Sequence, residues 1–66
     1  MDKNSVKESV WAAAYVDALW RDPRDIIAVL KLEGPQTPYT VAAEWADHAV
    51  RTLAHTSQGR KFLQNE

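Results

Sequence analysis

Residues 10–20 are the segment that most restricts what this chain can fold into. Ten of these eleven residues are hydrophobic, and Asp17 is the single exception. If the segment is helical, the helix is apolar around nearly its whole circumference, and such a helix is normally buried on all sides. The rest of a 66-residue chain provides too few helices to cover every side. We therefore expect one side of this segment to face another molecule.

Capping residues predict the first two helices. An S-x-x-E capping box beginning at Ser5 predicts a helix over residues 6–21. Asp22 is followed by Pro23, and a capping residue before a proline is typical of a helix start. This pair predicts a second helix over residues 23–33.

The end of the second helix is predicted from Gly34, which is well suited to the position just past a helix, and from Pro35, which prevents continuation. The β-branched segment 26–32 also fits a buried strand. We favour a helix because the segment lies between helix start and stop signals and no second strand-like segment is available to pair with it.

The third helix is predicted over residues 38–55, with Thr37 as its cap and Pro38 at its first position. Its residues separate into two sides at helical spacing. The apolar side comprises Val41, Ala42, Trp45, Ala46, Ala49, Val50 and Leu53, and the polar side comprises Glu44, Asp47, His48, Arg51 and His55.

A short helical turn is expected after the third helix over residues 58–64, and either Thr56 or Ser57 is expected to initiate it. Phe62 and Leu63 of this turn are expected to pack under the bundle. Gly59 weakens this turn by about 1 kcal/mol relative to Ala. The fold class is therefore predicted to be all-α: a three-helix bundle with a short C-terminal turn, forming a single domain over residues 1–66.

Two opposite stripes of the first helix compete for the bundle interior. One comprises Trp11, Ala14, Tyr15, Ala18 and Leu19, and the other comprises Val6, Val10, Ala13, Asp17 and Trp20. An unpaired carboxylate is costly to bury, so Asp17 marks the second stripe as the outward one. We predict that Val6, Val10, Ala13, Asp17 and Trp20 bind the partner, whose Arg, Lys or backbone N–H would meet Asp17.

Composition argues against several other functions. The chain has no cysteine, so disulfides, thiolate nucleophiles and Cys-ligated metals are excluded. A net charge of −1 provides no bulk attraction for nucleic acid or an anionic membrane. No apolar segment approaches the length of a membrane span, and the polar start is unlike a signal peptide. A cytoplasmic location without membrane contact is expected.

Ionisable residues on the polar side of the third helix are the best candidates for chemistry. Glu44 and His48 stand four residues apart, a spacing at which a carboxylate and an imidazole can hold a divalent metal or act in acid–base transfer. Asp47 and Arg51 have the same spacing, which is that of an ordinary surface ion pair. No third strong ligand, zinc-protease motif or Gly-rich phosphate loop accompanies them. We expect a solvated or partner-contacting side, no cofactor, no metal and no enzymatic activity.

A DNA-binding function is the main alternative. Residues 30–34 followed by 40–46 resemble the approach and first helix of a helix-turn-helix, although residues 47–54 continue the helix where a turn should follow. In a dimer, Arg51, Arg60 and Lys61 would supply the nucleic-acid contacts.

Small size favours association. A chain of this length gains little net stability from its core and usually needs a disulfide, a metal or oligomerisation. We therefore expect a protein-interaction module, either a homodimer or a small regulator that docks on a larger protein through the first helix.

Overall fold

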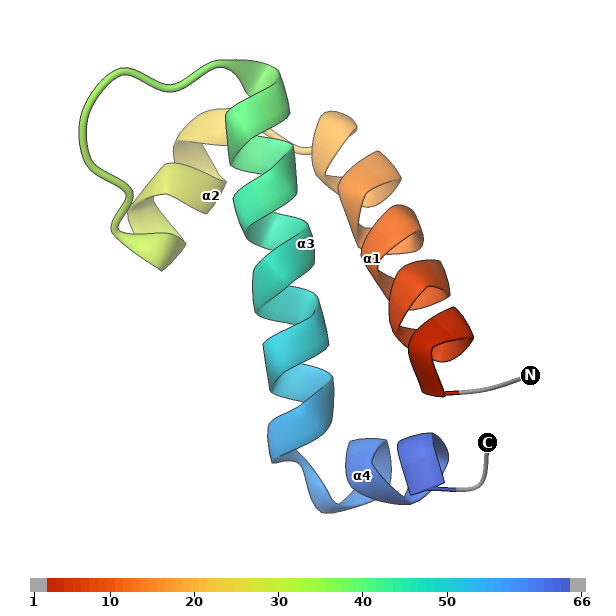
Figure 1. Cartoon of the computed structure of the whole chain (residues 1–66). Helices are drawn as coiled ribbons and strands as arrows, with labels where there is room; N and C mark the ends of the chain where they lie inside the picture. Colours follow the sequence, from red (N-terminus) through yellow and green to blue (C-terminus); the bar gives the residue numbers. More distant parts are fainter. Residues whose placement is uncertain (1–2, 65–66) are drawn as a thin grey trace.

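The computed structural model describes residues 3–64, including the side chains of residues 6–61, and it is all-helical over that range. The helices are α1 (Lys3–Leu19), α2 (Pro23–Leu30), α3 (Pro38–His55) and α4 (Ser57–Gln64). Figure 1 shows α1 and α3 lying side by side in opposite directions, with α2 at one end and α4 folded back at the other. The predicted fold class, with three main helices and a short C-terminal one, is confirmed.

The bounds of α1 differ from the prediction at both ends. The helix begins at Lys3, so Ser5 lies inside it and is not its cap. It ends at Leu19 because the backbone then tightens: Trp20 N–H donates to the Asp17 carbonyl and Arg21 N–H to the Ala18 carbonyl, both at 3.1 Å. This tight turn directs the chain into α2.

The start of α2 is as predicted. The Asp22 carboxylate accepts a hydrogen bond from the Arg24 backbone N–H at 2.9 Å, and Pro23 occupies the first turn. The helical state of Ile26 and the residues up to Leu30 rules out the strand alternative for this part of the segment.

The predicted end of α2 at Gly34 is wrong. The helix ends at Leu30, and Lys31 adopts the left-handed conformation (φ 56°, ψ 45°) that closes it. Leu32 N–H then donates to the Ile27 carbonyl at 3.0 Å, and the Leu32 side chain packs against the core. Returning this leucine to the core requires the chain to turn before residue 33.

The bounds of α3 are those predicted, and its cap is reciprocal. The Thr37 hydroxyl accepts from the Thr40 N–H at 3.1 Å, while the Thr40 hydroxyl accepts from the Thr37 N–H at 2.8 Å. Threonine here takes the part that Glu or Gln usually plays in a capping box. Pro38 fills the first helical position.

Thr56 joins α3 directly to α4, which begins one residue before the predicted bound. The Thr56 N–H donates to the Thr52 carbonyl at 3.2 Å, and its hydroxyl accepts from the Gly59 N–H at 2.9 Å. Gly59 is buried, and a Cβ there would overlap the Leu53 backbone carbonyl. The glycine is thus required for the close approach of α4 to α3.

The core between the helices is built from small side chains. The fully buried hydrophobic residues in the described part are Val6, Ala18, Ile26, Val41, Ala42 and Ala46. In α1 the side chains that turn inward at four-residue spacing are Val6, Val10, Ala14 and Ala18. Alanines in both helices allow α1 and α3 to approach closely and leave little room for large rings between them. The predicted packing of Phe62 and Leu63 concerns side chains outside those described.

Candidate interaction surface

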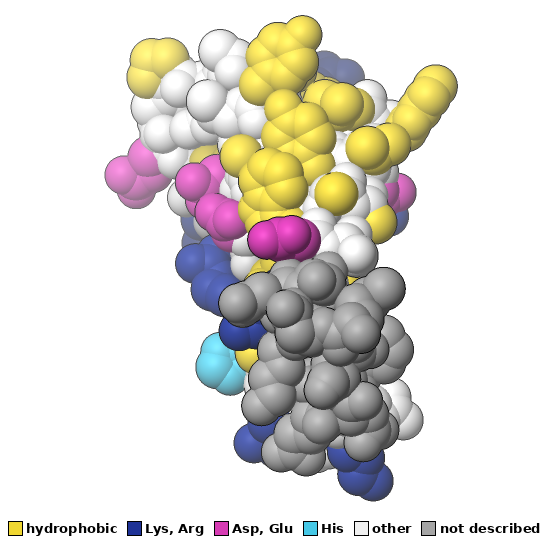
Figure 2. All heavy atoms as spheres, turned by 45° about the vertical axis from the view of Figure 1, so that its right-hand side comes forward, with side chains coloured by type: hydrophobic (Ala, Val, Ile, Leu, Met, Phe, Trp, Pro, Cys, Tyr) yellow, Lys and Arg dark blue, Asp and Glu magenta, His cyan; other side chains and the backbone are white. Residues whose placement is uncertain are grey.

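One side of α1 carries large apolar side chains that the rest of the described chain does not cover. Its exposed members are Trp11, Ala12, Ala13, Val16, Leu19 and Trp20, here called the α1 face. At 3.6 residues per turn they occupy one continuous arc of about 200°. Figure 2 shows hydrophobic side chains gathered over this side of the molecule. Trp20, at 86% exposure, is the most exposed of the large hydrophobic side chains that the structure describes.

Tyr39 is a further exposed apolar side chain, contributed by α3. Ala18 shares a buried cluster with Val41 and Ala42, so the end of α1 lies beside the start of α3. Tyr39, in the first turn of α3, is 68% exposed at this end of the molecule. The surface therefore draws on two helices that pack against each other.

The structure corrects the predicted assignment of the two stripes. Val6 is buried at 3% exposure and Val10 is half-buried, so the expectation that they face outward is wrong. Ala13, Asp17 and Trp20 are exposed as predicted.

The stripe predicted to turn inward is also divided. Ala18 is buried and Ala14 and Tyr15 are half-buried, as predicted, but Trp11 and Leu19 belong to the α1 face. The cause is the row of Val and Ala at four-residue spacing, which packs more closely on α3 than a row containing rings could. That spacing is the sequence signal by which Ala12, Val16 and Leu19 could have been recognised as outward residues.

Asp17 is paired within its own chain. Its Oδ2 accepts from Arg21 Nε at 2.7 Å, one helical turn along, with both side chains about half exposed. The hydrogen bond from Arg21 lowers the pKa of Asp17 below its ordinary value, and the Trp45 indole lowers this pKa further. The Arg21 guanidinium also lies over the Trp45 ring, 5.3 Å from its centroid. Asp17 therefore needs no cation from a partner, contrary to the expectation from sequence.

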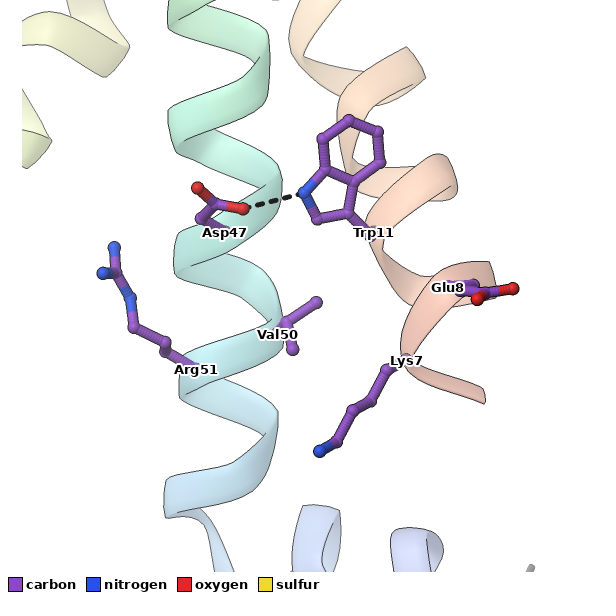
Figure 3. Close-up of a pocket in the computed structure, with 6 residues that line it drawn as sticks. All are labelled: Lys7, Glu8, Trp11, Asp47, Val50 and Arg51. Carbon is purple, nitrogen blue, oxygen red and sulfur yellow. Dashed lines mark hydrogen bonds between the residues drawn. The ribbon is translucent and has the colours of Figure 1, made fainter. Parts of the chain in front are cut away.

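Trp11 is anchored to α3 at the edge of the α1 face. Its indole N–H donates to Asp47 Oδ1 at 2.8 Å, as Figure 3 shows, and its ring stacks on Tyr15 with centroids 5.1 Å apart. The described ion pairs do not include the predicted one between Asp47 and Arg51.

A groove of about 380 Å³ runs beside this anchor, between α1 and α3. It is lined by Lys7, Glu8, Trp11, Asp47, Val50 and Arg51. Two cations and two anions flank its apolar floor, so the groove carries no net charge to select an ionic ligand.

The polar side of α3 shows no assembled reactive site. His48 lies against the Trp45 ring, with centroids 5.8 Å apart, and Glu44 is exposed. Among the described residues, no three potential His, Asp or Glu ligands come together. In the same part of the chain, no helix is long and apolar enough to cross a membrane.

The residues of the nucleic-acid alternative are exposed but divided between two helices, Arg51 in α3 and Arg60 and Lys61 in α4. The α3 helix is unbroken from Pro38 to His55, so it has no turn after Ala46 such as a helix-turn-helix requires. No family model, curated protein or solved structure compared with the chain matches it.

Proposed function

We propose that this chain is a non-enzymatic protein-interaction module and that its α1 face binds a protein. The observation that carries the proposal is Trp20, which projects with 86% exposure from an arc of apolar side chains. A tryptophan exposed in this way gains a large free energy when a partner covers it, and tryptophan is the residue type most enriched at binding hot spots.

The size of the surface supports this proposal. Taking about 150–250 Å² for an aromatic side chain, the α1 face and Tyr39 together expose on the order of 500 Å² of apolar surface. Contiguous apolar patches of roughly this size on a monomer are often interaction sites.

The chemistry of the surface favours a protein as the ligand. The α1 face is a convex helix side with no charged member, whereas small-molecule sites are concave and nucleic-acid sites are cationic. An apolar helix side is suited to packing against another apolar helix or groove.

Site-specific photocrosslinking tests the proposal. A photoreactive phenylalanine analogue at Val16 lies in the centre of the α1 face, and the same analogue at Glu44 lies on the exposed polar side of α3 as the control. We expect irradiation in the native cells to give a discrete protein adduct from position 16 and none from position 44. The mass of the adduct separates a second copy of the chain from a different protein.

Absence of an adduct at position 16, or the same adducts from both positions, would overturn the assignment of the α1 face as a protein-binding surface.

A further inference from the structure

We infer that the occupant of the α1 face is a second copy of this chain, packed with the two α1 helices antiparallel about a two-fold axis near Val16. This inference rests on the proposed function and names the partner. Three observations support it: the small core, the area of the face, and the distribution of large and small side chains along α1.

The core of one copy is small. Of the six fully buried hydrophobic residues described, three are Ala, two are Val and one is Ile. The chain has no cysteine for a disulfide, and its described residues assemble no metal site. Chains below about 70–80 residues usually need a disulfide, a metal or oligomerisation. Self-association stabilises the chain without any other molecule, because a second copy is present wherever the chain is synthesised.

The area of the face is sufficient for a dimer. Two such surfaces, each comprising the α1 face and Tyr39 and exposing on the order of 500 Å² as estimated above, would bury about 1,000 Å² in total. That total reaches the size at which a specific protein interface is expected.

The α1 face is complementary to itself in shape when the helices are antiparallel. Next to Val16 in the α1 face, small side chains, Ala12 and Ala13, precede it and large ones, Leu19 and Trp20, follow it. The large side chain further before it, Trp11, lies at the edge of the face, where it is bonded to Asp47 of α3. About a two-fold axis at Val16, residues equally distant before and after it face each other. Trp20 and Leu19 of one copy then cover Ala12 and Ala13 of the other. A parallel pair would place Trp20 on Trp20 and leave a gap between the alanines.

Sedimentation equilibrium of the purified full chain tests the dimer. We expect wild type to form a dimer and Trp20→Ala to raise its dissociation constant by about 30-fold or more, the loss typical of a hot-spot tryptophan. Val29→Ala is the control, because Val29 is 64% exposed on α2 and is not a member of the α1 face. It should leave the dissociation constant unchanged.

Disulfide trapping tests the position of the axis. Val16→Cys introduces the only thiol in the chain, and the axis brings it close to its own copy, within the short Cα separation that a disulfide requires. In a glutathione redox buffer we expect Val16→Cys to form a covalent dimer. Ala28→Cys, exposed on α2, should stay uncrosslinked under the same conditions. Disulfide trapping therefore tests the position of the interface on α1 even if Trp20→Ala fails to fold, as judged by loss of its helical circular dichroism.

The outcomes separate this inference from the proposed function. A purified chain that is monomeric at every concentration, while position 16 photocrosslinks to a different protein, overturns the dimer and supports the α1 face as a binding surface. A monomer that also gives no photoadduct overturns both. A dimer in which Trp20→Ala has no effect and Val16→Cys is not trapped overturns the placement of the interface on α1.

Discussion

The indole N–H of Trp11 in α1 donates to the Asp47 carboxylate of α3 at 2.8 Å, which links the two longest helices of the protein. Trp11 is only 36% exposed, whereas Trp20, at the end of the same helix, is 86% exposed. The two tryptophans of α1 therefore differ: Trp11 links α1 to α3 at the edge of the α1 face, whereas most of the Trp20 side chain is exposed within that face.

Trp11→Phe removes the donor and keeps an aromatic ring. We expect it to lower the free energy of unfolding by roughly 1 kcal/mol, the usual net value of one hydrogen bond, in urea unfolding at a fixed protein concentration. Asp47→Asn keeps a carbonyl acceptor and should lose less. An unchanged free energy of unfolding in Trp11→Phe would contradict a stabilising role for this bond.

Acidification is expected to break the pair between Asp17 and Arg21. Because Arg21 lowers the pKa of Asp17 in the folded chain, the contribution of this pair to stability is fully present above the ordinary value of 3.8 and is lost as pH falls through the lowered value. An NMR titration of the Asp17 carboxyl group should give a midpoint below 3.8.

Two arginine variants identify the cause of this shift. Arg21→Gln should move the Asp17 midpoint back toward 3.8. Arg24→Gln removes the partner of Asp22, which Arg24 contacts at 2.9 Å, and should leave the Asp17 midpoint where it is. If both variants move the midpoint equally, the shift does not come from the Arg21 pair.

Matched substitutions of two valines test the orientation of α1. Val6→Ala removes buried methyl groups and should lower the free energy of unfolding by about 2 kcal/mol. Val29→Ala makes the same change at an exposed site, where the effect should stay within about 0.5 kcal/mol. Equal losses in thermal or urea unfolding would contradict the burial of Val6 against its own chain.

Gly59→Ala should displace α4 although alanine is the better helix former. The added Cβ would overlap the Leu53 carbonyl, and backbone atoms cannot easily yield. Hydrogen exchange at residue 59, whose amide is bonded to the Thr56 hydroxyl, should become faster. Gln58→Ala, at an exposed position in the same helix, should leave that exchange unchanged or slow it.

The helix starts with side-chain caps were predictable from sequence because they depend on neighbouring residues. Asp22 and Thr37 each accept a backbone hydrogen bond from a residue two or three positions along the chain. The end of α2 was not predictable in this way. Lys31 takes the left-handed conformation, and Leu32 then packs against residues from other helices. The packing of Leu32 is a tertiary contact, so it produces no recognisable pattern in the neighbouring sequence.

The orientation of α1 was predicted only in part: Ala13, Asp17 and Trp20 face outward as predicted, but Val6 and Val10 turn inward. The interpretation from sequence gave weight to the cost of burying Asp17, but Arg21 of the same helix pairs with that carboxylate on the surface. The row from Val6 to Ala18 was the better signal, because small residues at four-residue spacing permit close helix packing.

The single-residue junction at Thr56 has a mechanical consequence. With helix on both sides, only the backbone torsions of this threonine separate the axes of α3 and α4. A rotation about the N–Cα bond of Thr56 swings α4 and carries the Thr56 hydroxyl with it, so it strains the hydrogen bond that this hydroxyl donates to the Leu53 carbonyl at 3.2 Å. A force applied to Arg60 or Lys61 in α4 would therefore reach α3 through this bond.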